Sequence, residues 1–133
     1  MIHTIIIKKE FIPGYISNGL VPNTIRRSKA QSLSIGVDNF ITGKQSNLDE
    51  VAAALGEKWQ PGKNWWFVQA NVSQPVENYL PAEILTAAGA ITAVLHFASP
   101  ASPPTFQAHP IETYLVNSLA THHLLQWIKV NAP

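Results

Sequence analysis

The sequence predicts an α/β fold built on a parallel sheet. Three short apolar runs, near residues 33–37, 65–70 and 91–97, have the length and the β-branched content of strands. A segment with a helical pattern follows each run, so strands and helices alternate along the chain. This alternation favours parallel strands joined by right-handed crossovers. Polar and apolar residues do not alternate within the runs, which is typical of strands buried on both faces.

The first predicted strand, residues 33–37, ends at Asp38 and Asn39, which commonly form turns. The segment SNLDEVAAAL follows it. Here Ser46 has an acidic residue three positions later, which is the spacing of a capping box, and Gly56 comes where a helix would end. We therefore expect a short helix that is capped by Ser46 and closed by Gly56.

The second strand is expected at residues 65–70, and a second helix in the segment PAEILTAAGA. Pro81 lies near the first turn of that helix, where a proline is tolerated, and Gly89 lies at its end. The third strand, residues 91–97, comes directly afterwards. These two strands and the helix between them complete the alternating pattern.

From Pro110 onward, the segment PIETYLVNSLATHHLLQWIKV contains no internal proline or glycine after its first residue. Apolar residues recur there at intervals of four, and Glu112 near the start is favourable to the helix dipole. The segment predicts one long helix. Between the third strand and this helix lies HFASPASPPTFQAHPI, a proline-rich corner of small residues that is expected to be a rigid loop approached by another group.

Residues 1–31 differ from the rest. Pro13 and Pro22 exclude a continuous helix across the middle of this segment, and no hydrophobic period is evident. A strand at residues 3–7 is the one element expected there. The domain boundaries are therefore an atypical segment at 1–31 and an α/β domain at 32–133.

The bulk properties restrict the class of protein. A chain of 133 residues with 46% hydrophobic residues can form one packed domain. The net charge is +1 and the basic residues form no stripe, so no nucleic-acid partner is expected. The absence of cysteine excludes disulfides and thiolate metal sites. The apolar run at residues 5–7 is too short for a membrane span or a signal peptide, and a cytoplasmic location is expected.

Two segments carry a resemblance to a known family. The segment AVLHFASPASPPTFQAHPIETYLVNSLATHHLL resembles the fourth strand, loop and following helix of extended short-chain dehydrogenase/reductases of the UDP-glucuronate decarboxylase type. The segment IGVDNFITGKQSNL resembles the second strand and the loop after it in the same family. The resemblance covers about residues 34–127 and implies a partial Rossmann-like three-layer fold, the incomplete nucleotide-binding half of an NAD-dependent nucleotide-sugar enzyme.

The resemblance also implies a site for NAD. An acidic residue at the end of the second strand accepts both hydroxyls of the adenosine ribose and repels a 2′-phosphate, which favours NAD over NADP. Asp38 has this position. The implied cofactor-binding residues are Asp38, Asn39, Thr42, Gly43, Asn71, Val72, Phe97, Ala98, Ser99 and Asn117. The implied loop on the substrate side contains Pro100, Ser102 and Pro103, and no metal ligands are expected.

The chain departs from the family at several positions. Asn71 replaces an aspartate, Ala120 replaces a glycine, and Leu115 replaces the lysine that contacts the substrate carboxylate. The glycine fingerprint that brings the backbone to the pyrophosphate is missing from the first thirty residues, where the glycines are Gly14 and Gly19. The N-terminal segment is thus a shifted reading frame, a divergent cap or a fusion scar.

The catalytic Tyr-x-x-x-Lys pair of the family is also missing. Each of the three tyrosines is followed four residues later by glycine, glutamate or serine. The leading interpretation is therefore a truncated NAD-binding region that is inactive alone. The alternatives are a non-enzymatic α/β module whose sheet edges pair with a second copy or a partner chain, and an enzyme with unidentified catalytic residues. Without the resemblance, Asp38 with Asn39 would be only a turn, Asn71 only a strand end, and the proline corner only a loop.

Overall fold

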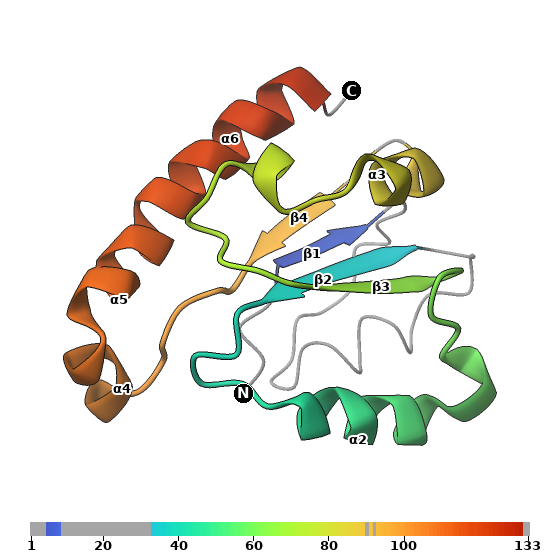
Figure 1. Cartoon of the computed structure of the whole chain (residues 1–133), viewed down its shortest axis with the longest axis horizontal. Coiled ribbons are helices and arrows are strands. Elements are labelled where there is room, and N and C mark those ends of the chain that lie inside the picture. The colour runs from blue at the N-terminus through green and yellow to red at the C-terminus, as the bar shows by residue number, and fades with distance from the viewer. Residues whose placement is uncertain (1–4, 9–32, 90, 92, 132–133) are drawn as a thin grey trace.

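The computed structural model describes residues 5–8, 33–89, 91 and 93–131 of the chain (Figure 1). Within this part the helices and strands are β1 Ile5–Lys8, β2 Ser34–Asp38, α2 Gln45–Leu55, β3 Trp65–Gln69, α3 Ala82–Ala88, β4 Ala93–His96, α4 Pro103–Ala108, α5 Pro110–Asn117 and α6 Leu119–Asn131. Two short 3-10 helices lie at Gly56–Lys58 and Val76–Asn78. The three strands expected between residues 33 and 97 are all present, as are the two helices between them.

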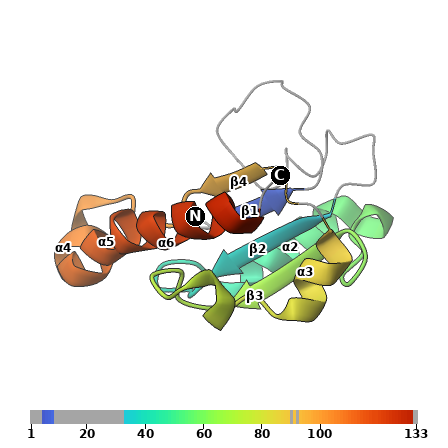
Figure 2. The ribbon, with the colours of Figure 1, turned by 90° about the horizontal axis from the view of Figure 1, so that it is seen from above.

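The four described strands form one sheet with the order β3-β2-β1-β4 (Figure 2). β2 and β3 are parallel, with Asp38 opposite Gln69. β1 is antiparallel to both β2 and β4, so β2, β3 and β4 point in the same direction. The predicted α/β class with parallel strand pairing is confirmed, and the arrangement is compatible with a partial Rossmann-like fold.

β1 overlaps the strand expected at residues 3–7, and residues 3 and 4 lie outside the described part. Ile5 pairs with Val37 and His96, whereas Lys8 pairs with the first residues of β2 and β4. β1 therefore starts at the carboxyl edge of its neighbours and ends at their amino edge. Gly14, Gly19 and the two prolines of the N-terminal segment lie outside the described residues.

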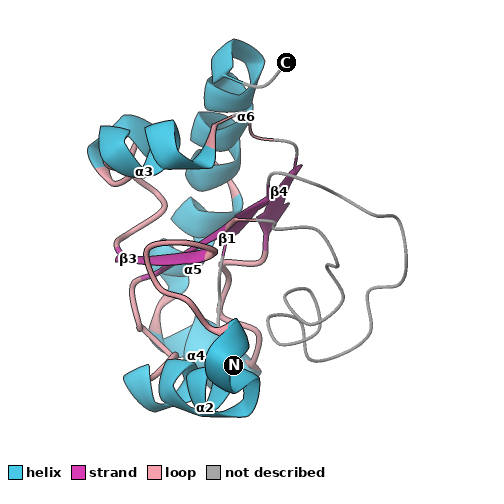
Figure 3. Ribbon diagram, turned by 90° about the vertical axis from the view of Figure 1, so that its right-hand side faces the viewer, coloured by secondary structure: helices cyan, strands magenta, loops and turns pink. Residues whose placement is uncertain are grey.

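Helices cover both faces of the sheet and give three layers (Figure 3). On one face, α3 and α6 pack over β2 through a cluster that includes Ile35, Val37, Leu124 and Trp127. On the other face, α2 packs against β3 through a smaller cluster built on Leu48 and Trp65. Side chains alternate between the faces along each strand, which is why neighbouring residues of β3 belong to different clusters. The expected three-layer architecture is confirmed.

The start of α2 differs from the prediction. Lys44 is the N-cap and makes no side-chain capping bond, and Ser46 is the second residue inside the helix. The capping-box interpretation was wrong, because the first turn begins two residues before Ser46, with the Asn47 N–H bonded to the Lys44 carbonyl at 3.0 Å. The expected end at Gly56 is confirmed: this residue has a φ of 51°, which glycine adopts without strain.

The long helix expected from Pro110 is interrupted at Ser118. Thr113, Asn117, Ser118 and Thr121 each bond through their side chains to the carbonyl four residues earlier. Such bonds compete with the helix backbone and bend helices. Hydrophobic spacing does not reveal them, because it reports which face is apolar and not how polar side chains bond.

Part of the expected rigid loop is helical. α4 begins at Pro103, and Pro103 and Pro104 occupy its first positions, where their fixed φ suits a helix and their missing N–H groups are not needed. Ser102 precedes the helix with an extended backbone. The loop proper therefore spans residues 97–102, which connect the end of β4 to α4.

Candidate functional site

A pocket lies where the carboxyl ends of β2, β3 and β4 meet. This edge lies on the left of the sheet in Figure 1, next to α4 and α5. Its walls come from the ends of three strands, the segments that follow them, and one residue within α5. The lining residues are Asp38, Asn39, Ile41, Ala70, Asn71, Val72, Ala98, Ser99, Pro100 and Val116. The carboxyl edge of parallel strands is the usual place for ligands in open α/β sheets.

Asp38 is the last residue of β2, and only 2% of its surface is exposed. Its Oδ1 accepts a hydrogen bond of 2.6 Å from the backbone N–H of Phe40. Phe40 has a φ of 58°, a left-handed conformation that is uncommon for a bulky residue. The Asn39 side chain accepts a second bond, of 3.1 Å, from the N–H of Ile41. The loop thus turns sharply around the carboxylate and fixes its orientation.

Gly43 closes this loop against the carboxylate. A Cβ at this position would lie 3.4 and 3.5 Å from the two oxygens of Asp38 and 3.2 Å from the ring of Phe40. The backbone of Gly43 therefore passes beside the carboxylate, and a Cβ there would be in tight contact with the Phe40 ring. Thr42 is half-buried, and its hydroxyl makes no hydrogen bond within the described part of the chain.

Asn71 and Val72 follow β3 and form a second wall. The Asn71 side-chain oxygen accepts a 3.0 Å bond from the N–H of Ser73, so it stabilises the local turn. Its amide nitrogen makes no hydrogen bond to the described residues and is a donor available at the mouth of the pocket. Val72 is 4% exposed and belongs to the larger core cluster.

The corner after β4 forms the third wall and is tied to α5. The Asn117 amide donates to the Ser99 hydroxyl at 2.8 Å and to the Thr113 carbonyl at 2.8 Å. The His96 Nε2 lies 2.9 Å from the Val116 carbonyl, to which it donates. Ala98 and Pro100 are buried. These contacts hold α5 beside the end of β4.

The structure brings together seven of the thirteen predicted site residues in the wall of the pocket: Asp38, Asn39, Asn71, Val72, Ala98, Ser99 and Pro100. Gly43 and Asn117 are connected to the wall through Asp38 and Ser99, respectively. Thr42, Phe97, Ser102 and Pro103 do not line it. Ser102 is exposed and its hydroxyl lies 2.7 Å from that of Thr105, so it stabilises the first turn of α4.

Sequence reasoning missed Ile41, Ala70 and Val116, which also line the pocket. All three are apolar and carry no chemical signal. Their neighbours carried the signal instead, since Ala70 precedes Asn71 and Val116 precedes Asn117. Only their closeness in sequence to a predicted polar residue could have indicated that they line the pocket.

The pocket is narrow. Its enclosed volume is about 30 Å³, which is close to the volume that one water molecule occupies in the liquid. An adenosine is many times larger.

The described residues contain no cluster of three or more histidine, aspartate or glutamate side chains that could hold a metal ion. His122 and His123 do not form such a site, and the His123 Nδ1 lies 3.1 Å from the Ser73 carbonyl.

Tyr79 is buried, and its environment raises its pKa to about 12, chiefly through desolvation and secondarily through the charge of Glu77. No helix in the described ranges has the length and apolar character needed to cross a membrane.

Comparison with known proteins finds a distant similarity. The UDP-glucuronic acid decarboxylase 1 proteins of Danio rerio and Xenopus tropicalis are each 30% identical to this chain over 89 residues. The match covers 67% of this chain and 17% of each relative. No protein-family model matches the chain, and no solved structure is significantly similar to it. This similarity agrees with the family resemblance found in the sequence, that of a nucleotide-sugar decarboxylase-like region. The chain spans only a small part of the length of these relatives.

Proposed function

We propose that the chain is the adenosine-binding part of an NAD site, from a region related to nucleotide-sugar decarboxylases. One observation supports this most strongly: Asp38, Asn71 and Ala98, predicted from three separate stretches of sequence, lie in the wall of one pocket. All three lie at the carboxyl edge of strands that point in the same direction, which is the usual place for a ligand in an open α/β sheet.

The geometry around Asp38 suits the two hydroxyls of a ribose. The Phe40 N–H orients the carboxylate, and the Gly43 backbone passes beside it. A carboxylate accepts hydrogen bonds from both hydroxyls, and such charge-assisted bonds are about twice as strong as neutral ones. The same negative charge repels a 2′-phosphate, so the site favours NAD over NADP.

The catalytic contribution of this chain is expected to be binding and not proton transfer. NAD, when bound, supplies hydride-transfer chemistry. The general base of the related enzymes is a tyrosine with a lysine four residues later, and none of the three tyrosines here has that partner. We therefore expect no decarboxylase activity from this chain alone, and the nucleotide-sugar substrate remains part of the proposal.

Calorimetric titration with NAD tests the proposed function. Asp38→Asn removes the charge but keeps the shape, and it should weaken NAD binding by about tenfold or more, since bonds to charged groups contribute about 1.5–3 kcal/mol. Asp49→Asn is the matched control, because Asp49 is an exposed carboxylate on α2 that bonds only Gln45. Equal losses in both variants, or no saturable binding by the folded wild-type chain, would refute the proposal.

A second candidate function is assembly with another chain. Several large apolar side chains on α5 and α6 are strongly exposed, namely Ile111, Tyr114, Leu125 and Val130. β3 and β4 are also the edge strands of the described sheet, and exposed edges favour pairing with other strands. Light scattering of the purified chain tests pairing with a second copy: a monomer at all concentrations would remove that form of assembly.

A further inference from the structure

We propose that His96 is a positioning residue for the pocket: its side chain holds α5 at a fixed distance from the end of β4 and so sets the place of one pocket wall. This inference rests on the proposed function, because it concerns the same pocket. His96 is not among the lining residues, whereas Val116, to which it bonds, is one of them. His96 therefore acts through the backbone of α5 and not by touching the ligand.

The sheet fixes the backbone from which this side chain extends. His96 is the last residue of β4, and its Cα lies opposite that of Ile5 in β1. The hydrogen bonds between paired strands restrict how far a residue can move along or across the sheet. The imidazole of His96 is thus attached to a rigid base.

The imidazole joins this base to α5. The His96 Nε2 lies 2.9 Å from the Val116 carbonyl oxygen, and since a carbonyl can only accept, Nε2 carries the proton and donates it. The Nδ1 atom of the same ring is buried, so the ring lies inside the contact between β4 and α5. The bond therefore selects one tautomer and one orientation of the ring.

α5 depends on such a bond because little apolar burial holds it. None of its eight residues is buried within the described part of the chain, whereas α6 buries three of its own, including Trp127. The two helices are separated at Ser118, so the packing of α6 does not by itself fix α5. The His96 bond reaches α5 at Val116, two residues before this interruption.

A second bond joins the same two segments in the opposite direction. The Asn117 amide on α5 donates to the Ser99 hydroxyl in the corner at 2.8 Å. The Ser99 N–H in turn bonds to the Phe97 carbonyl at 2.9 Å, which makes a tight turn centred on Ala98. His96 and Asn117 thus connect the corner and α5 from both sides, and loss of either bond lets the two segments separate.

The size of the pocket makes this separation matter for binding. Its enclosed volume is about 30 Å³, and Ala98, Ser99 and Val116 lie in its wall. In so small a space, a displacement of about 1 Å alters the contacts that a ligand can make. The apparent dissociation constant rises in proportion as the fraction of molecules with the wall in place falls.

The experiment is a calorimetric titration of the full chain with NAD, in the wild type and in three variants of His96. His96→Leu removes the donor and should weaken NAD binding by about three- to tenfold. His96→Gln places an amide N–H close to the position of Nε2 and should restore binding to within about twofold of the wild type. His96→Asn places its amide near Nδ1, too short to reach Val116, and should lose as much as His96→Leu.

Two further measurements separate positioning from a general loss of stability. Urea unfolding of each variant fixes the conditions in which it is folded, and the titrations are made there. His122→Leu is the matched control, because His122 is an exposed histidine on α6 that does not line the pocket, and it should leave NAD binding unaltered. Nitrogen-15 NMR of the wild-type histidine rings should show the Nε2–H tautomer for His96, a test that does not depend on any variant folding.

The outcomes that overturn the inference are distinct from those that overturn the proposed function. If the wild type binds NAD but folded His96→Leu or His96→Asn binds it equally well, if His96→Gln loses as much as His96→Asn, or if the ring proton is on Nδ1, the inference fails while the proposed function stands. If the folded wild-type chain does not bind NAD, both fail together.

Discussion

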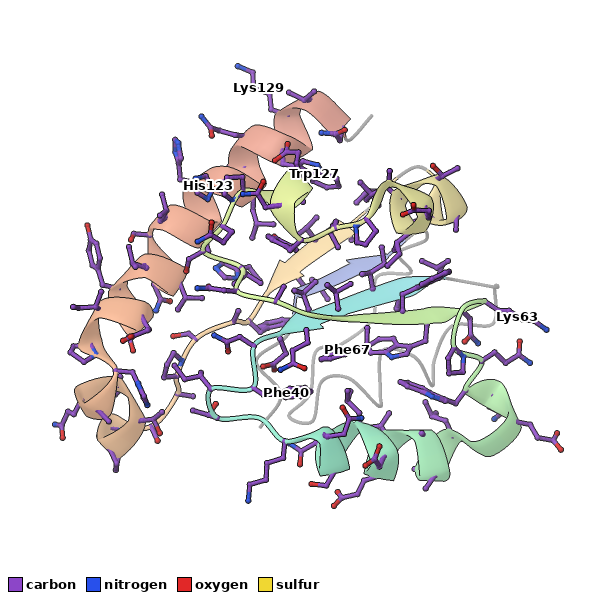
Figure 4. All side chains as sticks on the ribbon, viewed as in Figure 1. Phe40, Lys63, Phe67, His123, Trp127 and Lys129 are labelled. Atoms are coloured by element: carbon purple, nitrogen blue, oxygen red, sulfur yellow. The ribbon has the colours of Figure 1, made fainter. Side chains whose placement is uncertain are left out.

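The two faces of the sheet are built differently. Among the described residues, the face under α3 and α6 has a cluster of fourteen buried side chains, mostly aliphatic. The cluster under α2 has two buried members among the described residues, Leu48 and Trp65, and its partly buried neighbours are largely aromatic, while Val51 and Leu55 of α2 are also buried. Figure 4 shows this contrast, with Trp127 on the side of α6 and Phe40 and Phe67 on the side of α2.

The smaller face carries the loop that holds Asp38. Phe40, in the left-handed conformation, stacks on Phe67 of β3 with ring centroids 5.3 Å apart. Trp59 and Trp65 pack farther along the same face at 4.9 Å. We therefore expect the larger cluster to contribute more to stability than the smaller one, while the smaller one holds Phe40 beside Asp38. Mutations on the larger face should therefore reduce mainly the stability of the fold, whereas mutations on the smaller face should also reduce ligand binding.

The largest effect is expected on the larger face. Leu124 of α6 is 3% exposed, and Leu124→Ala should reduce the free energy of unfolding by about 2–5 kcal/mol through the lost transfer energy and the cavity left behind. Leu125→Ala is the matched control, since this neighbour is 62% exposed and should cost less than about 0.5 kcal/mol. Urea unfolding measures both. Similar losses at the two positions would mean that α6 is not packed as described.

A smaller loss of stability, with a loss of binding, is expected at Phe67. Phe67→Ala should reduce the free energy of unfolding by about 2 kcal/mol, below the range for fully buried aromatic residues, because Phe67 is only half-buried. It also removes the ring on which Phe40 stacks, so nucleoside binding should weaken. Trp59→Ala on the same face is the control and should leave binding unchanged. Unchanged binding in Phe67→Ala would break the proposed link between this face and the pocket.

The third effect depends on pH and concerns Tyr79 on the larger face. Its folded pKa is raised to about 12 from 10.0, so above pH 10 the unfolded chain loses the proton while the folded chain keeps it. Stability is therefore retained below pH 10 and lost as the pH rises through 12, by about 1 kcal/mol at pH 11. Tyr79→Phe should abolish this part of the alkaline loss.

At neutral pH, Tyr79→Phe should be neutral or slightly stabilising. The buried hydroxyl makes no hydrogen bond to the described residues, so its removal leaves no partner unsatisfied. Thermal unfolding of both proteins at pH 8 and at pH 11 provides the measurement. An identical alkaline decrease in the two proteins would show that Tyr79 is not the group responsible.

The smallest effect is expected from Gly43→Ala. The added Cβ would meet the Phe40 ring at 3.2 Å, so this ring must shift by a few tenths of an ångström, whereas its 3.4 Å approach to the Asp38 carboxylate is an ordinary contact. Stability should change by less than about 1 kcal/mol, while nucleoside affinity falls several-fold because Phe40, whose N–H orients the carboxylate, is displaced. Ser46→Ala, on the exposed start of α2, is the control. Unaltered affinity in Gly43→Ala would show that the orientation of the carboxylate does not depend on the exact position of the Phe40 ring.

The sequence predicted the strands around residues 34–38 and 65–69 because buried strands are short, continuous apolar runs. It did not predict the direction of β1, since the apolar content of Ile5 to Ile7 is the same whichever way the strand runs. The sequence also did not predict the hydrogen bonds that the Asn117 and Ser118 side chains make to backbone carbonyls, at the point where the final helix is divided. The convergence of Asp38 and Asn71 was predicted by resemblance, whereas the apolar part of the pocket, such as Val116, was not.

The position of β1 also bears on the order in which the chain can fold. β1 precedes the other described strands along the chain, yet its pairing partner β4 lies almost ninety residues later. β4 borders no other strand in the described sheet, so it cannot join the sheet unless β1 is already in place. Pairings so distant in sequence are slow to form. During synthesis, the ribosome must therefore release residue 96 before the strands at the two ends of this sheet can be held together.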